Sequence, residues 1–185
     1  MARLLCLLIL RLIGWRTVFV PPPGPKSVIV VYPHTSNWDF PIGLLFRFQY
    51  PLHLHWAGKD TLFRGPLGAL LRRIGGIPIN RRERTGTIGQ IVDAFAGNAS
   101  FHIAITPEGT RAKTGYWKSG FYRIALAAGV PVGLGFIDYR EKCLGVERWI
   151  TLSGDEAADL ALLRAYYAGK TARYPEKAGD IRFKS

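Results

Sequence analysis

The chain has 185 residues, 48% of them hydrophobic, and a formal net charge of +12. Its length and apolar content predict one folded domain with a substantial core and exclude a disordered chain. The charge indicates an anionic partner, which is a nucleic acid, a membrane surface or a phosphorylated substrate, and composition alone does not choose among these.

The first predicted element is an N-terminal helix, residues 1–20, rich in leucine and arginine. Its uninterrupted apolar run, residues 4–10, is far shorter than the roughly 20 residues that a membrane-spanning helix needs. No small-residue cleavage site follows, so we do not expect a removable signal peptide. Arg3, Arg11 and Trp15 are typical of an amphipathic helix in the headgroup layer of a membrane. A first helix packed on the core explains them equally well.

After the stiff stretch PPPGP, strand-like and helix-like segments alternate along the chain. The predicted strands are residues 27–33, 52–58, 75–80, 100–106, 130–139 and 145–152, and the predicted helices are 38–48, 66–74, 86–97, 118–129 and 155–169. Strands separated by helices predict an α/β fold, a single layered domain with a central, largely parallel or mixed sheet flanked by helices. We therefore divide the chain into the N-terminal helix (1–20), expected to anchor on a membrane surface, a main domain (26–170) and a C-terminal tail (171–185).

The stretch YPHTSNWDF, residues 32–40, places a histidine and an aspartate five positions apart, between a predicted strand and a predicted helix. Five residues turn a helix through about 500°, so the pair meets only if His34 lies on the loop and Asp39 in the first helical turn. Asp39 would then bind one imidazole nitrogen, and the other would take a proton from a substrate hydroxyl. In the alternative, Ser36 or Asn37 caps the helix and His34 is an ordinary turn residue.

The stretch ITPEGTRAKTGYWKSGF begins where another predicted strand ends. Gly109 permits a positive φ, and the turn presents Glu108, Thr110 and Arg111 together. The planar fork of Arg111 suits a phosphate, and Glu108 would hold an acceptor hydroxyl or orient Arg111. The alternative is an ordinary turn with a surface Glu–Arg pair.

Two further stretches carry weaker signals. Arg81 follows GGIPIN, a third strand end. The other arginines of the basic stretch FRGPLGALLRRIGGIPINRRER are expected to be solvated. Val130 and Pro131, in GVPVGLGF, would line an apolar channel, although a buried edge strand explains them equally well. The histidines and the two cysteines form no cluster with metal-ligand spacing, so we expect no metal site.

In this order, HTSNWD, GGIPINR, PEGTR and GVPV resemble the four sequence blocks of the glycerolipid acyltransferases. That superfamily includes the lysophosphatidate and glycerol-3-phosphate acyltransferases, and the resemblance covers roughly residues 28–138. It implies that His34 is a general base and that Asp39 orients it. It further implies that acceptor binding involves Lys59, Arg81, Glu108, Gly109, Thr110 and Arg111, and that acyl-chain or donor placement involves Val130 and Pro131.

We therefore expect an acyltransferase of phospholipid biosynthesis that moves a fatty acyl group to the hydroxyl of a lysophospholipid-like acceptor, such as 1-acyl-glycerol-3-phosphate. The donor would be acyl-CoA or acyl carrier protein as a co-substrate, without an acyl-enzyme, a metal or another cofactor. The other expected partner is a membrane, bound peripherally on its cytoplasmic face. A nucleic-acid-binding module would explain the charge but shows no recognised fingerprint. A non-catalytic basic lipid-binding protein would not need His34 or Asp39.

Overall fold

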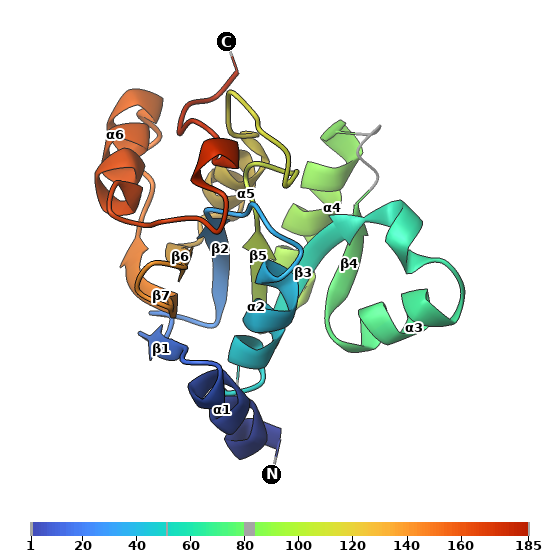
Figure 1. Ribbon diagram of the computed structural model, residues 1–185. Helices are drawn as coiled ribbons and strands as arrows, with labels where there is room; N and C mark the ends of the chain where they lie inside the picture. Colours follow the sequence, from blue (N-terminus) through green and yellow to red (C-terminus); the bar gives the residue numbers. More distant parts are fainter. Residues whose placement is uncertain (1, 51, 80–83, 185) are drawn as a thin grey trace.

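The computed structural model describes residues 2–50, 52–79 and 84–184, which form a sheet of seven strands in the order β1-β7-β6-β2-β5-β3-β4 (Figure 1). All neighbouring strands run parallel except β6 and β7, which are antiparallel. The strands are β1 (Arg16–Phe19), β2 (Lys26–Tyr32), β3 (Leu54–Lys59), β4 (Gly76–Ile79), β5 (Phe101–Ile105), β6 (Val132–Asp138) and β7 (Cys143–Ile150). The predicted α/β fold with a mixed, largely parallel sheet is confirmed.

Helices cover both faces of this sheet. They are α1 (Ala2–Leu12), α2 (Asp39–Arg47), α3 (Gly65–Arg73), α4 (Arg84–Gly97), α5 (Gly120–Ala128) and α6 (Glu156–Tyr167), with short 3₁₀ turns η1 (Asp60–Phe63) and η2 (Pro175–Lys177). The main core lies between the sheet and α4, α5 and α6. A smaller core lies on the other face, where α1 and α2 pack.

The central strand β2 shows why the chain folds in this way. Its run of β-branched residues suits a strand that is covered on both sides. Val28, Val30 and Tyr32 enter the main core, whereas Val31 packs against the smaller core on the opposite face. Because β2 lies between β5 and β6, the loop at its carboxyl end emerges at the middle of the sheet edge, a position where α/β proteins build their sites.

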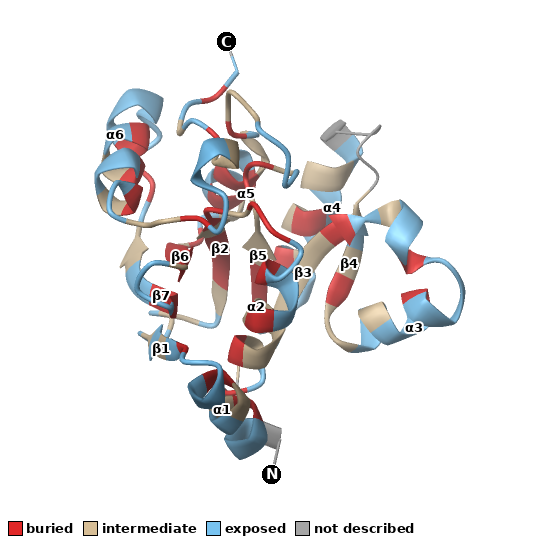
Figure 2. Cartoon of the chain, viewed as in Figure 1, coloured by how far each residue is buried: buried red, intermediate tan, exposed pale blue. Residues whose placement is uncertain are grey.

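The N-terminal helix packs on the core, as one of its two interpretations predicted. Leu10 is fully buried and Cys6 is nearly so, whereas other leucines of α1 remain exposed (Figure 2). The helix ends at Leu12 rather than at residue 20, because Gly14 adopts a left-handed conformation with φ 79° and β1 then begins at Arg16. In the described part of the chain, no helix is long and apolar enough to cross a membrane.

The segment predicted as a C-terminal tail packs on the domain through several buried residues. Ala172 and Phe183 are buried, and Phe183 forms an isolated parallel bridge with Trp117. The backbone N–H of Trp117 donates a hydrogen bond to the carbonyl of Arg182 over 2.7 Å. The segment therefore completes the main core and reaches the carboxyl edge of the sheet.

Candidate active site

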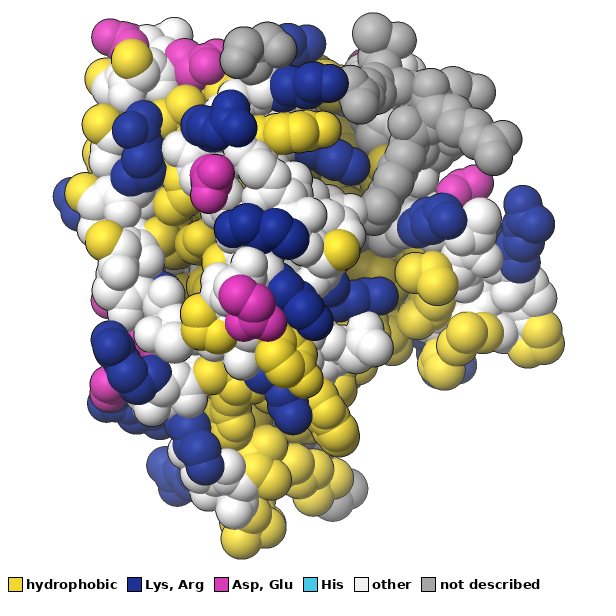
Figure 3. Space-filling view, turned by 45° about the horizontal axis from the view of Figure 1, so that its top comes forward, with side chains coloured by type: hydrophobic (Ala, Val, Ile, Leu, Met, Phe, Trp, Pro, Cys, Tyr) yellow, Lys and Arg dark blue, Asp and Glu magenta, His cyan; other side chains and the backbone are white. Residues whose placement is uncertain are grey.

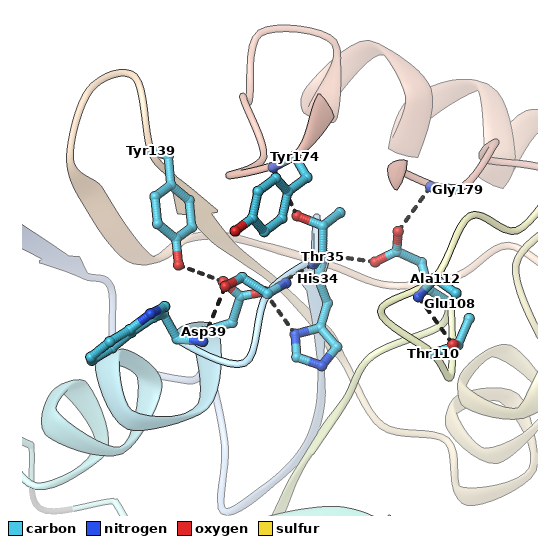
Figure 4. Close-up of polar contacts among 11 residues, drawn as sticks. His34, Thr35, Asp39, Glu108, Thr110, Ala112, Tyr139, Tyr174 and Gly179 are labelled. Atoms are coloured by element: carbon cyan, nitrogen blue, oxygen red, sulfur yellow. Dashed lines mark hydrogen bonds and ion pairs between the residues drawn. The ribbon is translucent and has the colours of Figure 1, made fainter. Parts of the chain in front are cut away.

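His34 and Asp39 meet, as the five-residue spacing predicted for a loop–helix junction. β2 ends at Tyr32 and α2 begins at Asp39, so His34 lies on the connecting loop. The Nδ1 atom of His34 lies 3.0 Å from Oδ2 of Asp39 (Figure 4). The N-cap residue of α2 is Trp38, which makes no side-chain capping bond, and the Ser36 hydroxyl accepts the backbone N–H of Trp38 over 3.1 Å.

The Asp39 carboxylate receives further hydrogen bonds besides that of His34. Oδ2 accepts the backbone N–H groups of Thr35 and Ser36, each over 2.9 Å, and Oδ1 accepts the hydroxyl of Tyr139 over 2.6 Å. Burial alone would raise the pKa of Asp39, but the hydrogen bonds from His34, Tyr139 and Ser36 outweigh it and hold this pKa below its usual value. The carboxylate is therefore ionised at neutral pH.

An ionised Asp39 decides the tautomer of His34. Nδ1 must carry a proton to donate to the carboxylate, so in the neutral ring Nε2 presents a lone pair. The His34 side chain is 16% exposed and that of Asp39 is 1% exposed, so the base is accessible and its partner is not. This arrangement suits a general base that takes a proton at Nε2.

Glu108 has partners other than those expected for an acceptor-binding residue. It is buried with 2% exposure, and its two oxygens accept backbone N–H groups, Oε2 from His34 over 2.6 Å and Oε1 from Gly179 over 2.8 Å. Burial raises the pKa of Glu108 to about 7, although the two N–H groups oppose this shift. In this structure the carboxylate joins the loop of His34 to the C-terminal segment.

Four of the other predicted residues line one cavity together with His34 and Asp39. Gly109 has φ 61°, as predicted, and the Thr110 hydroxyl accepts the backbone N–H of Ala112. The side chain of Arg111 is exposed, and Lys59 is exposed at the carboxyl end of β3. The two cations and the dyad therefore face the same space.

The cavity has a volume of about 630 Å³ and a mostly apolar wall. Its lining runs from the sheet under α2 to η1 and α3, and includes Ile29, Phe40, Leu44, Trp56, Leu62 and Leu71. Such a space beside a polar dyad suits a substrate with a reacting polar end and an apolar remainder.

Three predicted site residues lie elsewhere. Val130 is buried in the main core, and the carbonyl of Pro131 accepts the backbone N–H of Val28 at the amino end of β6. This is the opposite end of the strands from His34, and neither residue lines the cavity. Arg81 lies outside the described residues. The roles that the resemblance implied for these three residues stay predictions.

Sequence reasoning missed three contributors to this site. Tyr139 binds Asp39, Gly179 binds Glu108, and the backbone N–H of Tyr174 donates to the Thr35 hydroxyl over 3.2 Å. Tyr139 follows β6 directly, so the strand-end argument used for His34 and Glu108 also applies to it. No comparable signal marks Gly179 or Tyr174, because their contacts span more than 70 residues of sequence.

Comparison with known proteins shows the class to which this α/β chain belongs. A family model described as Acyltransferase matches residues 21–133, well over half of the chain, so the chain belongs to this family and is an enzyme of this class. The crystal structure of PlsC from Thermotoga maritima, a 1-acyl-sn-glycerophosphate (LPA) acyltransferase, has the same fold with a TM-score of 0.59. Its sequence is 16% identical, and the match covers 93% of this chain and 80% of that one. No curated protein matches the chain.

Proposed function

We propose that the protein transfers a fatty acyl group from acyl-CoA or acyl carrier protein to the hydroxyl of a lysophospholipid-like acceptor such as 1-acyl-glycerol-3-phosphate. The observation that carries this proposal is the His34–Asp39 pair, 3.0 Å apart, on an apolar cavity that Lys59 and Arg111 also line. The similar fold of PlsC, a 1-acyl-sn-glycerophosphate acyltransferase, supports this class of acceptor.

In the proposed reaction, Nε2 of His34 takes the proton of the acceptor hydroxyl as the oxygen attacks the thioester carbonyl. The tetrahedral intermediate collapses, the carbon–sulfur bond breaks, and the thiolate recovers the proton from the imidazolium. Asp39 stabilises that imidazolium between the two transfers. General-base assistance of this kind typically contributes about 10²–10⁴-fold to the rate. The reaction balances without an acyl-enzyme, a metal or a resident cofactor.

Acceptor recognition is assigned to the cations at the strand ends. Arg111 offers a planar fork and Lys59 a point charge, which together complement a phosphate monoester. Gly109 and Thr110 lie on the same loop and line the same cavity, whose apolar wall would hold an acyl chain. For Arg81 the proposal rests on the sequence resemblance alone.

The protein is further proposed to work peripherally at a membrane, on its cytoplasmic face. Lipid acceptors lie in a bilayer, and α1 presents exposed leucines with Arg3 and Arg11 at its two ends. Amphipathic helices with this composition bind the headgroup layer of anionic membranes.

Replacing the base tests the mechanism. His34→Ala is expected to abolish acyl transfer without unfolding the protein, because the imidazole is an accessible group on a loop. Asp39→Asn is expected to lower kcat less than His34→Ala does. The measurement is thiol release from acyl-CoA in the presence of lysolipid, together with a thermal melt of each variant. Near wild-type turnover by folded His34→Ala would refute the proposed chemistry.

Replacing the cations tests the acceptor. Arg111→Ala and Lys59→Ala are each expected to raise KM for a phosphorylated acceptor by about 10–150-fold, the equivalent of one charge-assisted hydrogen bond. A neutral acceptor such as a monoacylglycerol serves as the comparison. An equal loss with both acceptors would contradict the assignment of a phosphate to these two side chains.

A further inference from the structure

The exposed apolar side chains of this protein are not scattered over its surface. Among the described residues, the large hydrophobic side chains with high exposure lie in residues 4–20, 38–48 and 62–70, with Leu126 and Tyr174 as the exceptions. In Figure 3, hydrophobic side chains gather along the lower edge and at the right of the molecule, where α1 and α3 lie in Figure 1. Exposed apolar surface gathered in this way marks an interaction site.

Two helices contribute most of this surface. On α1, Leu4, Leu8 and Leu12 follow one another at i, i+4 spacing and are 70%, 53% and 76% exposed, beside the buried stripe that packs on α2. On α3, Leu67 and Leu70 are 58% and 55% exposed, and Leu62 of η1 adds a further exposed side chain. Each helix therefore has apolar side chains that no other part of the described chain covers.

The segments between these helices are in direct contact. Leu10 of α1 packs in the smaller core with Phe46 of α2. At the other end of α2, the ring of Phe40 lies 4.7 Å from that of Trp56, which in turn lies 5.6 Å from the ring of Phe63 in η1. The exposed apolar side chains of α1, α2 and η1–α3 thus belong to elements that pack in succession.

The active-site cavity lies within this succession. Its wall includes Phe40 and Leu44 of α2 on one side and Leu62, Leu67 and Leu71 of η1–α3 on the other. Leu62 and Leu67 are both exposed and cavity-lining, so the apolar surface continues from the outside of the molecule into the cavity.

The charges beside these leucines are complementary to an anionic surface. Exposed arginines flank both helices, namely Arg3 and Arg11 on α1 and Arg64, Arg72 and Arg73 at the ends of α3. Among residues 60–73, which make up η1–α3, Asp60 is the only acidic residue. Leucines on the outer sides of two helices, bordered by arginine, suit a bilayer with anionic headgroups, because such a surface takes up apolar side chains and attracts cations at the same time.

We propose that η1–α3 is a second membrane-binding element, which docks on an anionic bilayer together with α1 and holds the entrance of the cavity against the headgroup layer. A lipid would then enter the cavity from the bilayer without crossing water. Only this last consequence rests on the proposed acyl transfer, since the docking itself requires a lipid surface and no reaction.

Site-specific labelling tests the docking directly. Both native cysteines are buried, so a single exposed cysteine can be labelled with a polarity-sensitive maleimide dye. The variants are Leu70→Cys on α3, Leu8→Cys on α1 and Leu126→Cys as the matched control, which is exposed on α5 at the opposite face of the sheet. Vesicles of mixed phosphatidylcholine and phosphatidylglycerol are expected to shift the dye emission to the blue at positions 70 and 8 but not at 126.

A loss-of-binding experiment complements the labels. Leu67→Ser combined with Leu70→Ser is expected to weaken co-sedimentation with the same vesicles by about tenfold, with an unchanged thermal melt. Leu126→Ser is expected to bind like the wild-type protein. Vesicle binding is measured without substrate, so its result is independent of whether acyl transfer is detected in a separate assay with detergent-dispersed acceptor.

Three outcomes would overturn the proposal. The first is a blue shift at position 8 with none at positions 70 and 126. This result would mean that α1 binds the membrane and that α3 does not. The second is an equal response at all three positions, which indicates non-specific adsorption. The third is a blue shift at position 70 on raising protein concentration without lipid, which would mean that a second copy of the chain covers this surface.

Discussion

Asp39 organises the candidate active site at the scale of single residues, because both of its carboxylate oxygens accept hydrogen bonds. Oδ2 accepts hydrogen bonds from the imidazole of His34 and from the backbone N–H groups of Thr35 and Ser36, and Oδ1 accepts the hydroxyl of Tyr139. A carboxylate restrained in this way keeps the imidazole in one tautomer and one orientation. Tyr139 thus acts on the proposed base through Asp39, as a positioning residue.

Tyr139→Phe is expected to lower kcat by about 10–150-fold while KM stays unchanged, because it removes a hydrogen bond of 2.6 Å to a charged group that does not touch substrate. Tyr166→Phe is the matched control, since it also removes a hydroxyl hydrogen bond on this sheet, but to the carbonyl of Leu134. The measurement is the steady-state kcat and KM of both variants. A rise in KM with unchanged kcat would assign Tyr139 to substrate binding instead.

At the scale of single elements, the helix α1 has two apolar stripes, of which one is buried and the other is exposed. One stripe, with Cys6 and Leu10, packs against α2 and the end of the sheet, and the other remains exposed. Amphipathic periodicity alone predicts one apolar face and does not say which stripe is buried. The packing of Leu10 in the smaller core, together with Phe46 and Leu144, shows which stripe is buried.

Leu10→Ala is expected to lower the free energy of unfolding by about 2–5 kcal/mol, because it opens a cavity at a fully buried position. Leu8→Ala, at 53% exposure on the same helix, is expected to change it by less than about 1 kcal/mol. Urea denaturation of the two variants makes the comparison. Similar losses for both would mean that the exposed stripe is covered in solution.

At the scale of the whole molecule, Glu108 connects three distant parts of the chain. It lies on the loop after β5, accepts the N–H of His34 after β2, and accepts the N–H of Gly179 in the C-terminal segment. Tyr32, at the end of β2, donates its hydroxyl to the carbonyl of the same Gly179 over 3.1 Å. The position of the proposed base therefore depends on the last residues of the chain.

This arrangement makes stability depend on pH in a defined direction. Burial raises the pKa of Glu108 from an ordinary 4.5 to about 7, so between these values the folded state binds more protons than the unfolded state. The contribution of Glu108 to stability therefore falls as pH rises through this interval. Glu108→Gln removes this titration. As pH rises through the interval, the melting temperature of the variant is therefore expected to increase relative to that of the wild type. A difference in melting temperature that stays constant over this pH interval would contradict the raised pKa of Glu108.

The predictable parts of this protein are those encoded over short stretches of sequence. Alternation of β-branched strands with amphipathic helices indicated the α/β fold, and the spacing of His34 and Asp39 across a strand–helix junction indicated a dyad before any contact was known. Gly109 at a positive φ follows from the same kind of local rule. In each case one short segment holds both the residue and the geometry that it needs.

The tertiary structure alone decided what depends on distant segments. The short edge strand β1, the bond of Tyr139 to Asp39 and the contact of Gly179 with Glu108 join residues that are 71 to 127 positions apart. It also decided that Glu108 is buried, that Val130 and Pro131 lie at the opposite end of the strands, and which leucines of α1 and α3 stay exposed. Local propensity does not predict these contacts and burials. They arise only when the strand order of the sheet determines which loops and helix faces become neighbours.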